Sequence, residues 1–336
     1  MIGENIRKMR ILKGMSLRAF GSLAGVSQTA VMKYENDELT PDGEKLLKFA
    51  KILECDVIDL LKDNSNRKPL NLNFRKREAL KGKKIEQLKM IINDNVNNYL
   101  DVLELNNIEK KKLKKYSINS YDDAEKAASN FRKDNNINEI IPLADLCNII
   151  ENLGVYIVIV KNDNGRFTGF DGVSEIVEGF PFICIASDIN YYRQRFTLAH
   201  ELGHLVLDIK NELDEEQVCN DFASALLLPQ IAMRLEFGSK RLGIGDREYE
   251  IVRQEYKVSI KAIIKRLAKC GIITSNNEKM SYIHFNRDMK NDEYQLSLRY
   301  KESSRQYEQL TLRLINQELI TRSRFNELMK GYNVDE

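Results

Sequence analysis

The chain has 336 residues, of which 43% are hydrophobic, so it is long enough for two or three ordinary globular domains. Its formal net charge is only +2, which excludes a general polycation, and any DNA binding must rest on local patches. The five cysteines show no C-x-x-C spacing and indicate reduced thiols. Since no apolar run has membrane-spanning length and the first residues lack the apolar core of a signal peptide, we expect a cytoplasmic protein with no membrane partner.

The first 61 residues carry apolar side chains at helical spacing, interrupted by polar breaks, and this pattern predicts about five short helices. Ser16 is suited to cap one helix, Gly25 to end it, and Ser27 to cap the next. A helix, a short glycine turn and a second helix are the geometry of a helix-turn-helix. The second helix of such a motif enters the major groove by its N-terminal end.

The stretch 15–36 closely resembles the XRE-type domain, the DNA-binding module of phage repressors and Cro proteins. The resemblance implies double-stranded operator DNA as a partner and a homodimer as the binding form. By match to that family, the residues that face bases are Gln28, Thr29 and Lys33, and those nearer phosphates are Arg18, Ser27 and Asn36. Glutamine can pair with adenine, threonine offers a hydroxyl and a methyl, and lysine reaches guanine or phosphate. A bundle used only for dimerisation would share the apolar pattern, but exposed polar residues at a helix start favour groove contact.

Basic residues cluster at 7–10, 75–84 and 110–115. Charge runs are usually solvated helix faces, and we assign only the first cluster to DNA contact. The polar stretch 63–73 contains a proline and shows no period, so it is predicted to be a linker.

Beyond the linker, periodicity predicts helices over 78–105, 108–116 and 143–153, the last ended by Gly154. Apolar runs at 155–160 and 180–186 predict two strands. A strand such as the second one can lie along an active cleft and pair with an extended substrate.

The sequence His200-Glu201-Leu202-Gly203-His204 contains two of the three histidines of the chain. On a helix, positions i and i+4 lie on the same face, so both imidazoles can bind one cation, and the spacing is typical of a zinc site. Glu201 then lies beside the metal, where a general base takes a proton from water. The flanking residues are mostly apolar, and buried histidines without a metal would need other partners.

A catalytic zinc usually takes three protein ligands. Downstream, an acidic segment leads into an apolar helix that Pro229 stops, with Glu215 and Glu216 in its first turn. We choose Glu216 as the third ligand, because Asn220 lies one turn later on the same face and can orient the site. Glu215 and Asp208 remain alternatives, and acidic residues at a helix start also complement the helix dipole.

The stretch 195–207, together with Glu216, 219–223 and 226–229, resembles the ImmA/IrrE family of metallopeptidases. The resemblance covers roughly residues 71–274 and implies a zincin-like domain. In that family two histidines and a downstream glutamate bind Zn2+ and the motif glutamate is the catalytic base, roles that fall here on His200, His204, Glu216 and Glu201. Two positions depart from the usual pattern: Cys219 stands where alanine is common, and Asp208 where histidine is common. Asp208 therefore keeps the third ligand open.

The remaining segments carry less chemistry. The segment 256–271 could be a second DNA-reading helix pair, with Ser259 as cap and Gly271 as stop, but we expect it to pack around the catalytic domain. His284 lies in an apolar-polar alternation and is expected in a strand. Residues 303–332 predict a terminal helical pair.

The sequence thus predicts a multidomain protein. An all-α helix-turn-helix domain (1–62) and the linker (63–73) precede an α+β zincin-like zinc metallopeptidase domain (74–274) and a helical C-terminal extension (275–336). The expected function is a DNA-binding transcriptional regulator that cleaves a protein substrate, either a helix-turn-helix repressor or itself, in a stress or mobile-element response. The alternative is a repressor or antitoxin whose zincin-like domain senses a signal or binds a partner without proteolysis. An intact Glu201 favours the enzyme.

Overall fold

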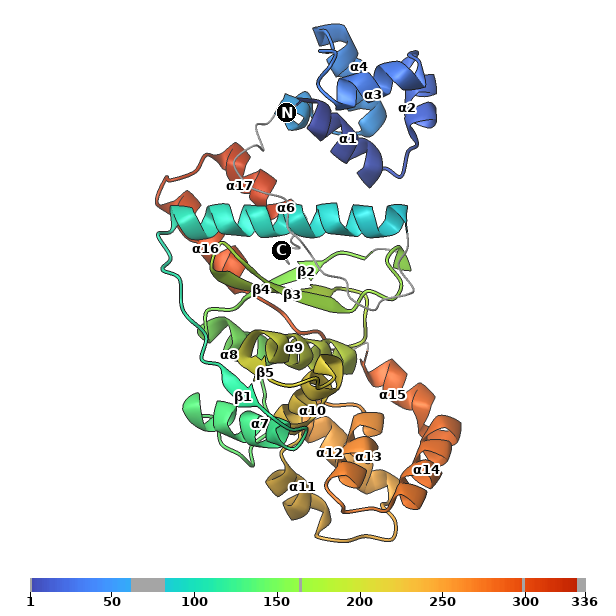
Figure 1. Ribbon diagram of the computed structural model, residues 1–336, viewed down its shortest axis with the longest axis vertical. Helices are drawn as coiled ribbons and strands as arrows, with labels where there is room; N and C mark the ends of the chain where they lie inside the picture. The colour runs from blue at the N-terminus through green and yellow to red at the C-terminus, as the bar shows by residue number, and fades with distance from the viewer. Residues whose placement is uncertain (1, 62–81, 163–164, 298–299, 331–336) are drawn as a thin grey trace. The chain divides into compact units, whose positions relative to one another are not determined.

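The computed structural model describes residues 2–61, 82–162, 165–297 and 300–330 (Figure 1). It divides into two compact units, one comprising Met1–Asp101 with Asn164–Phe170 and the other Val102–Asp163 with Asp171–Glu336. The linker predicted at 63–73 lies outside the described residues. Among the helices described, none is both long and apolar enough to cross a membrane.

The first unit opens with the five short helices that the apolar spacing predicts. They are α1 (Ile2–Leu12), α2 (Leu17–Ala24), α3 (Gln28–Glu35), α4 (Gly43–Leu53) and α5 (Val57–Leu61), and α6 (Lys83–Leu105) follows. Phe49 lies at the centre of their core, with the rings of Phe20 and Tyr34 packed edge-on at 5.2 and 5.4 Å between centroids. Because the five helices share one small core, each of them positions the helix-turn-helix.

The predicted ends of α2 and α3 are confirmed. The hydroxyls of Ser16 and Ser27 accept hydrogen bonds from the backbone N–H groups of Ala19 and Ala30. Gly25 ends α2 with a φ of 72°, a left-handed conformation that favours glycine. Gly21 has no room for a side chain, because a Cβ there would lie 2.7 Å from the carbonyl oxygen of Val26. Ser16 thus fixes the start of α2, and the other three positions fix the turn between the two helices.

The assignment of the basic cluster 7–10 to DNA contact is wrong for Arg10. That side chain is buried and forms a two-pronged ion pair with Glu35, at 2.5 and 2.8 Å, while its Nη1 donates to the carbonyl oxygen of Met15. Lys8 pairs with Asp94 of α6 at 2.6 Å. Charge alone could not separate these roles, since a buried guanidinium with satisfied hydrogen bonds looks the same in sequence as an exposed one.

The described residues of the second unit form five strands and most of the helices. In chain order they are β1 (Tyr116–Ile118), α7 (Asp123–Asp134), α8 (Leu146–Asn152), β2 (Tyr156–Val160), β3 (Gly172–Val177), β4 (Phe180–Ala186), α9 (Tyr191–Val206), β5 (Leu207–Ile209), α10 (Glu215–Leu227), α11 (Gln230–Phe237), α12 (Asp246–Tyr256), α13 (Ile260–Lys269), α14 (Ser275–His284), a π-helical turn (Phe285–Met289), α15 (Lys290–Ser297), α16 (Gln306–Asn316) and α17 (Arg322–Met329). Helices α8 and α9 pack on one face of the three-stranded sheet (Figure 1). The predicted helices at 143–153 and 303–332 and the strands at 155–160 and 180–186 are confirmed.

The three-stranded sheet has the order β2-β4-β3, with β2 parallel and β3 antiparallel to β4. The expectation that β4 lines the cleft and pairs with substrate is wrong, because β4 is central and both of its edges are already paired. The edge strands of the described sheet are β2 and β3, and the sequence prediction missed β3. Its signal was the two-residue turn Glu178-Gly179, where both residues have positive φ, between the paired Val177 and Phe180.

The predicted helix at 108–116 is also wrong. The chain after α6 is not helical, and it enters β1, which pairs in parallel with β5 from Tyr116↔Leu207. Five lysines in the stretch 110–115 would stand three and four residues apart on a helix, and such like charges repel each other.

The strand expected around His284 is a helix instead. Thr274 caps α14 by accepting a hydrogen bond from the backbone N–H of Asn277, and α14 runs to His284 itself. The apolar-polar alternation there covers only a few residues, which is too short to outweigh a well-capped helix.

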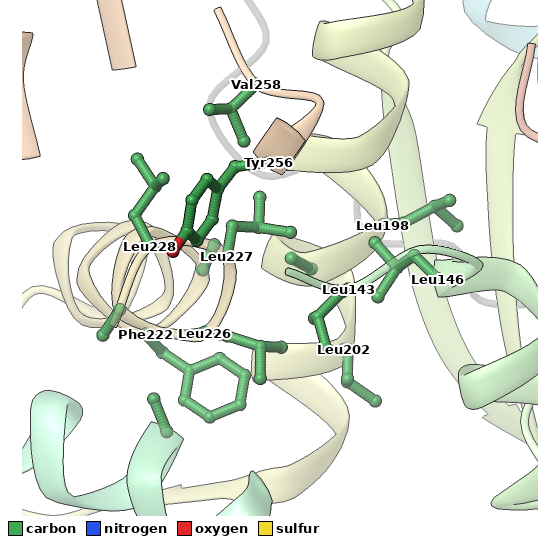
Figure 2. Packing of buried hydrophobic residues seen from close by; sticks show 14 of the residues in the cluster. Leu143, Leu146, Leu198, Leu202, Phe222, Leu226, Leu227, Leu228, Tyr256 and Val258 are labelled. Atoms are coloured by element: carbon green, nitrogen blue, oxygen red, sulfur yellow. The ribbon is translucent and has the colours of Figure 1, made fainter. Parts of the chain in front are cut away.

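Helix α10 lies at the centre of the hydrophobic core of this unit. Figure 2 shows Leu202 of α9 beside Leu226 of α10, and Leu198 of α9 nearer Leu146. Residues of α12 and α13 join the same core, so the segment 256–271 packs around this domain as expected, with Ser259 capping α13. Two buried arginines donate to carbonyl oxygens at the end of α10. Arg132 of α7 donates to that of Leu226, and Arg266 of α13 donates to that of Leu228. These bonds satisfy groups that a helix end leaves open and hold α10 in place.

Candidate functional site

The HExxH segment lies in the second half of α9. Asn190 begins this helix by accepting a hydrogen bond from the backbone N–H of Arg193. His200 and His204 follow one turn apart, with ring centroids 4.9 Å apart and Nε2 atoms 3.1 Å apart. Both imidazoles therefore face the same point beside the helix.

Helix α10 brings Glu216 to that point. Asp214 caps α10 by accepting from the backbone N–H of Glu216 at 3.1 Å. The Glu216 carboxylate lies 3.4 Å from His200 Nε2 and 3.8 Å from His204 Nε2. Among the described residues, these three form the one group of His, Cys, Asp or Glu side chains whose ligand atoms could hold a metal, all within 4.8 Å of one another.

The separations fit a zinc ion. Zn–N bonds of about 2.0–2.1 Å at tetrahedral angles place two ligand atoms roughly 3.3 Å apart. The observed 3.1, 3.4 and 3.8 Å lie close to that value. Two nitrogens and one carboxylate oxygen are also a donor set that zinc accepts while keeping a position for water.

The protonation of the two histidines also favours metal binding. Burial is the largest effect on the pKa of His200 and lowers it. The charge of Glu201 comes next and raises the pKa, His204 lowers it further, and Glu216 and Asn220 have smaller raising effects, so the net shift is downward. His200 is thus held neutral, the form that a metal requires. Glu215 lies 2.9 Å from His204 Nδ1, and because a carboxylate only accepts, this contact favours the tautomer whose Nε2 carries a lone pair.

The alternatives for the third position lie elsewhere. Asp208, in β5, forms an ion pair with Lys210 at 2.7 Å and is outside the three-residue group. Glu215 contacts the far nitrogen of His204. Asn220, which we expected to orient Glu216, lies beside His200.

Glu201 lies between α9 and the sheet. It is 4% exposed, and its Oε2 accepts a hydrogen bond from the hydroxyl of Ser174 in β3 at 2.8 Å. Burial and the Glu201 charge raise the pKa of Cys184 in β4, so that thiol is neutral. Ser174 was missed in the sequence because its strand was missed.

The glycine of the motif has a packing role. A Cβ at Gly203 would lie 3.3 Å from the ring of Phe222 and 3.4 Å from the Sγ of Cys219. Helix α10 therefore lies close to α9 beside the two histidines, and this closeness lets a residue of α10 complete the group.

In the first unit, the residues expected to face bases are exposed on α3. Gln28, Thr29 and Lys33 lie on the side of that helix opposite the buried Val31 and Tyr34. Met32, which sequence reasoning overlooked, is 46% exposed between them.

The residues expected near phosphates have mixed roles. Arg18 is exposed on α2. Ser27 is exposed, but its hydroxyl is used as the cap of α3. Asn36 ends α3 and its side-chain amide donates to Glu38 at 3.2 Å.

Comparison with known proteins agrees with the two units. The helix-turn-helix family model matches residues 6–60, and the Peptidase_M78 model, described as the IrrE N-terminal-like domain, matches residues 150–268. Repressor protein C2 of Salmonella phage P22 is 33% identical over 82 residues, which cover 24% of this chain and 37% of that protein. The chain thus spans little more than a third of the length of that relative. A Mycobacterium tuberculosis transcriptional regulator is 15% identical with a TM-score of 0.32 over 51% of each chain, a likeness too weak to define a fold.

The fold and the matches define a multidomain protein with a repressor-like helix-turn-helix and a metallopeptidase-like domain. More particularly, the chain joins an XRE-type helix-turn-helix domain to a domain of the ImmA/IrrE type.

Proposed function

We propose that this protein is a DNA-binding transcriptional regulator with a zinc-dependent peptidase site, which cleaves a repressor protein or its own chain. The observation that carries the proposal is the group formed by His200, His204 and Glu216, together with Glu201, which follows His200 in α9 and whose charge acts on that imidazole. A cytoplasmic location, where such a protein meets operator DNA, is part of the proposal.

The three grouped side chains would hold the zinc ion. When bound, zinc acidifies water and polarises a peptide carbonyl. Glu201 would take the proton from the attacking water and pass it to the leaving amine nitrogen. Its 4% exposure keeps bulk water away from the carboxylate. The outer edge of β3, which has no strand partner among the described residues, is suited to hold an extended substrate by backbone pairing.

The DNA-binding part of the proposal rests on α3. Gln28, Thr29 and Lys33 would face base edges, and Arg18 of α2 a phosphate. Ser27, which caps the start of α3, and Asn36, which ends it, would lie near the phosphates of the DNA backbone. Operators read by such domains are usually bound by two copies, so a homodimer is expected on DNA.

Metal content of the purified full-length protein, measured by plasma mass spectrometry, tests the site. We expect about one zinc per chain in the wild type and in Asp208→Ala, and loss of zinc in Glu216→Ala. Glu215→Ala should retain zinc with lower affinity, because that carboxylate contacts His204 at Nδ1 and not at Nε2, which faces the candidate metal position. Wild-type protein without zinc would contradict the proposal. Loss of zinc in Asp208→Ala, with zinc retained in Glu216→Ala, would make Asp208 the third ligand.

Glu201→Gln separates the peptidase from a sensor that cleaves nothing. This variant keeps the size of the side chain and should retain zinc and DNA binding. In a peptidase its turnover falls about a hundredfold or more, because a general base contributes roughly 10²–10⁴ in rate. Unchanged regulatory output in cells carrying Glu201→Gln would support the non-proteolytic alternative.

A further inference from the structure

The proposed general base has a neutral partner outside its own helix. Ser174, in β3, donates its hydroxyl proton to Glu201 Oε2 over 2.8 Å. Ser174 is half-buried and Glu201 is 4% exposed, so the bond is formed at the border between the core and the surface. A hydrogen bond to a charged group in such a place is stronger than one in water.

The backbone fixes where that hydroxyl lies. Strand β3 is tied to β4 by antiparallel pairing, in which Ser174 is opposite Ile183. Two residues earlier, Gly172 lets β3 approach α9 so closely that a Cβ there would lie 2.6 Å from Thr197 Cγ2. Thr197 precedes Glu201 by one helical turn, so the close approach leads directly to the Ser174 contact.

A glutamate side chain has three rotatable bonds, and its carboxylate must present an oxygen in a defined direction to accept a proton from a reacting water. We propose that Ser174 is a positioning residue for Glu201, which fixes the carboxylate by holding Oε2. The inference rests on the proposed peptidase function, deepens it, and assigns to β3 a role in catalysis besides pairing with substrate.

A structural role is the competing explanation, since any buried carboxylate needs donors. The chain offers a matched control in Ser304, whose hydroxyl donates to another buried glutamate, Glu151. Loss of that hydroxyl removes the same kind of bond far from the HExxH segment in sequence.

The test uses full-length protein loaded with zinc and acetohydroxamate as the probe, because a hydroxamic acid chelates zinc and gives its proton to the adjacent base. Affinity is measured by calorimetry for the wild type, Ser174→Ala, Ser174→Thr and Ser304→Ala. We expect Ser174→Ala to bind acetohydroxamate about three- to tenfold more weakly, the effect of one lost hydrogen bond. Ser174→Thr, which keeps the hydroxyl, and Ser304→Ala should bind as the wild type does, and all four should hold equal zinc.

Measurements in the Glu201→Gln variant distinguish a positioning role of Ser174 from a purely structural role. If Ser174 acts through Glu201, adding Ser174→Ala to Glu201→Gln weakens binding no further. An equal loss in both backgrounds, or no loss in Ser174→Ala, would overturn the positioning role while leaving the zinc site in place. Should Ser174→Ala fold poorly, Ser174→Val against Ser174→Thr gives the same comparison, because these side chains differ only in the hydroxyl.

Failure of the proposed function has a different signature. A wild type without zinc would overturn both the peptidase and the positioning role. A wild type that holds zinc and shows the Ser174 dependence, yet cleaves neither itself nor a repressor, would contradict proteolysis alone. With a cleaved protein in hand, Ser174→Ala should lower kcat with KM unchanged, since a group that acts through the base does not bind substrate.

Discussion

Arg195 of α9 and Glu302, 107 residues later, form an ion pair at 2.5 Å in which the two side chains are 0% and 5% exposed. Arg195 also donates to the carbonyl oxygen of Leu143, and the backbone N–H of Glu302 donates to Gln194. The helix that carries the histidines is thus tied to the segment before α16. The C-terminal part of the chain, which showed no chemistry in sequence, supports the candidate site.

Removal of one partner should therefore be costly. Glu302→Ala would leave a buried guanidinium without its carboxylate, and we expect a loss of about 3–5 kcal/mol in the free energy of unfolding. Denaturant unfolding followed by circular dichroism measures it, with Glu212→Ala, at an exposed carboxylate, as the control. A loss below about 1 kcal/mol would show that the pair contributes little beyond what surface pairs do.

The same pair makes the proposed domain limits testable. A chain ended at residue 274 would lack Glu302, so the segment 74–274 should fold poorly without the extension. Limited proteolysis compares the segment 74–274 with the same segment continued through the C-terminal extension. Equal resistance of the two to the protease would show that the domain ends at residue 274.

The close approach of β3 to α9 supports a second prediction. Gly172→Ala would place a methyl 2.6 Å from Thr197 Cγ2 and 3.1 Å from the carbonyl oxygen of Cys184. Overpacking of this kind costs about 1–3 kcal/mol in the free energy of unfolding. It should also move Ser174 from Glu201 and weaken acetohydroxamate binding.

A second substitution identifies the cause of that loss. Thr197→Ser removes the methyl group that a Cβ at position 172 would meet, so the double variant should recover part of the stability. Thermal unfolding of both single variants and the double variant measures the recovery. Additive losses would mean that the clash with the carbonyl oxygen of Cys184 dominates.

The elements that the sequence predicted are those with local causes. Ser16, Gly25 and Ser27 act within their own turns, and the apolar spacing of α9 is visible along one stretch. His200 and His204 share a face by helical geometry alone. By contrast, the contact of Glu216 with both imidazoles depends on how α10 packs against α9, which no local pattern specifies.

What the sequence did not predict has non-local causes. Ser174 becomes a partner of Glu201 only through the pairing of β3 with β4. The burial of Arg10 depends on Glu35, 25 residues away. The lysines near 110 were expected in a helix, whereas β1 is formed through pairing with β5, some ninety residues later.

Stability near β1 should depend on acid pH through Asp123. This carboxylate accepts from the Lys126 ammonium, the backbone N–H groups of Asn119 and Ser120, and the Ser120 hydroxyl, which lower its pKa from 3.8 to about 2. A group with a lowered pKa in the folded state stabilises it above its unfolded pKa. That stability is lost as the pH falls from about 4 towards 2.

We therefore expect Asp123→Ala to lower the Tm by a few degrees at pH 7 and by clearly less near pH 2, where the wild type has lost most of the same contribution. Asp122→Ala is the matched control, because that neighbour forms no side-chain bond at the start of α7. Thermal unfolding across this pH range measures both variants. A difference that stays constant with pH would assign the loss to the backbone rather than to the charge.

The last prediction separates base contacts from phosphate contacts in the helix-turn-helix. Gln28→Ala should cost about 1–3 kcal/mol of discrimination at one base pair of a duplex selected from random sequences. Arg18→Ala should weaken binding to all sequences alike and reduce the slope of log K against log salt by about one. Neither change touches the core of the first unit, since both side chains are exposed.

Ser27→Ala has a different expected signature, because its hydroxyl caps α3. It should lower the free energy of unfolding by about 1 kcal/mol, and weaken DNA binding through loss of the helix end. Fluorescence anisotropy across a salt series, with thermal unfolding of the same variants, distinguishes the three. If Gln28→Ala changed the salt slope while leaving base preference intact, the N-terminal end of α3 would face the phosphates, and the placement of the recognition helix proposed here would be wrong.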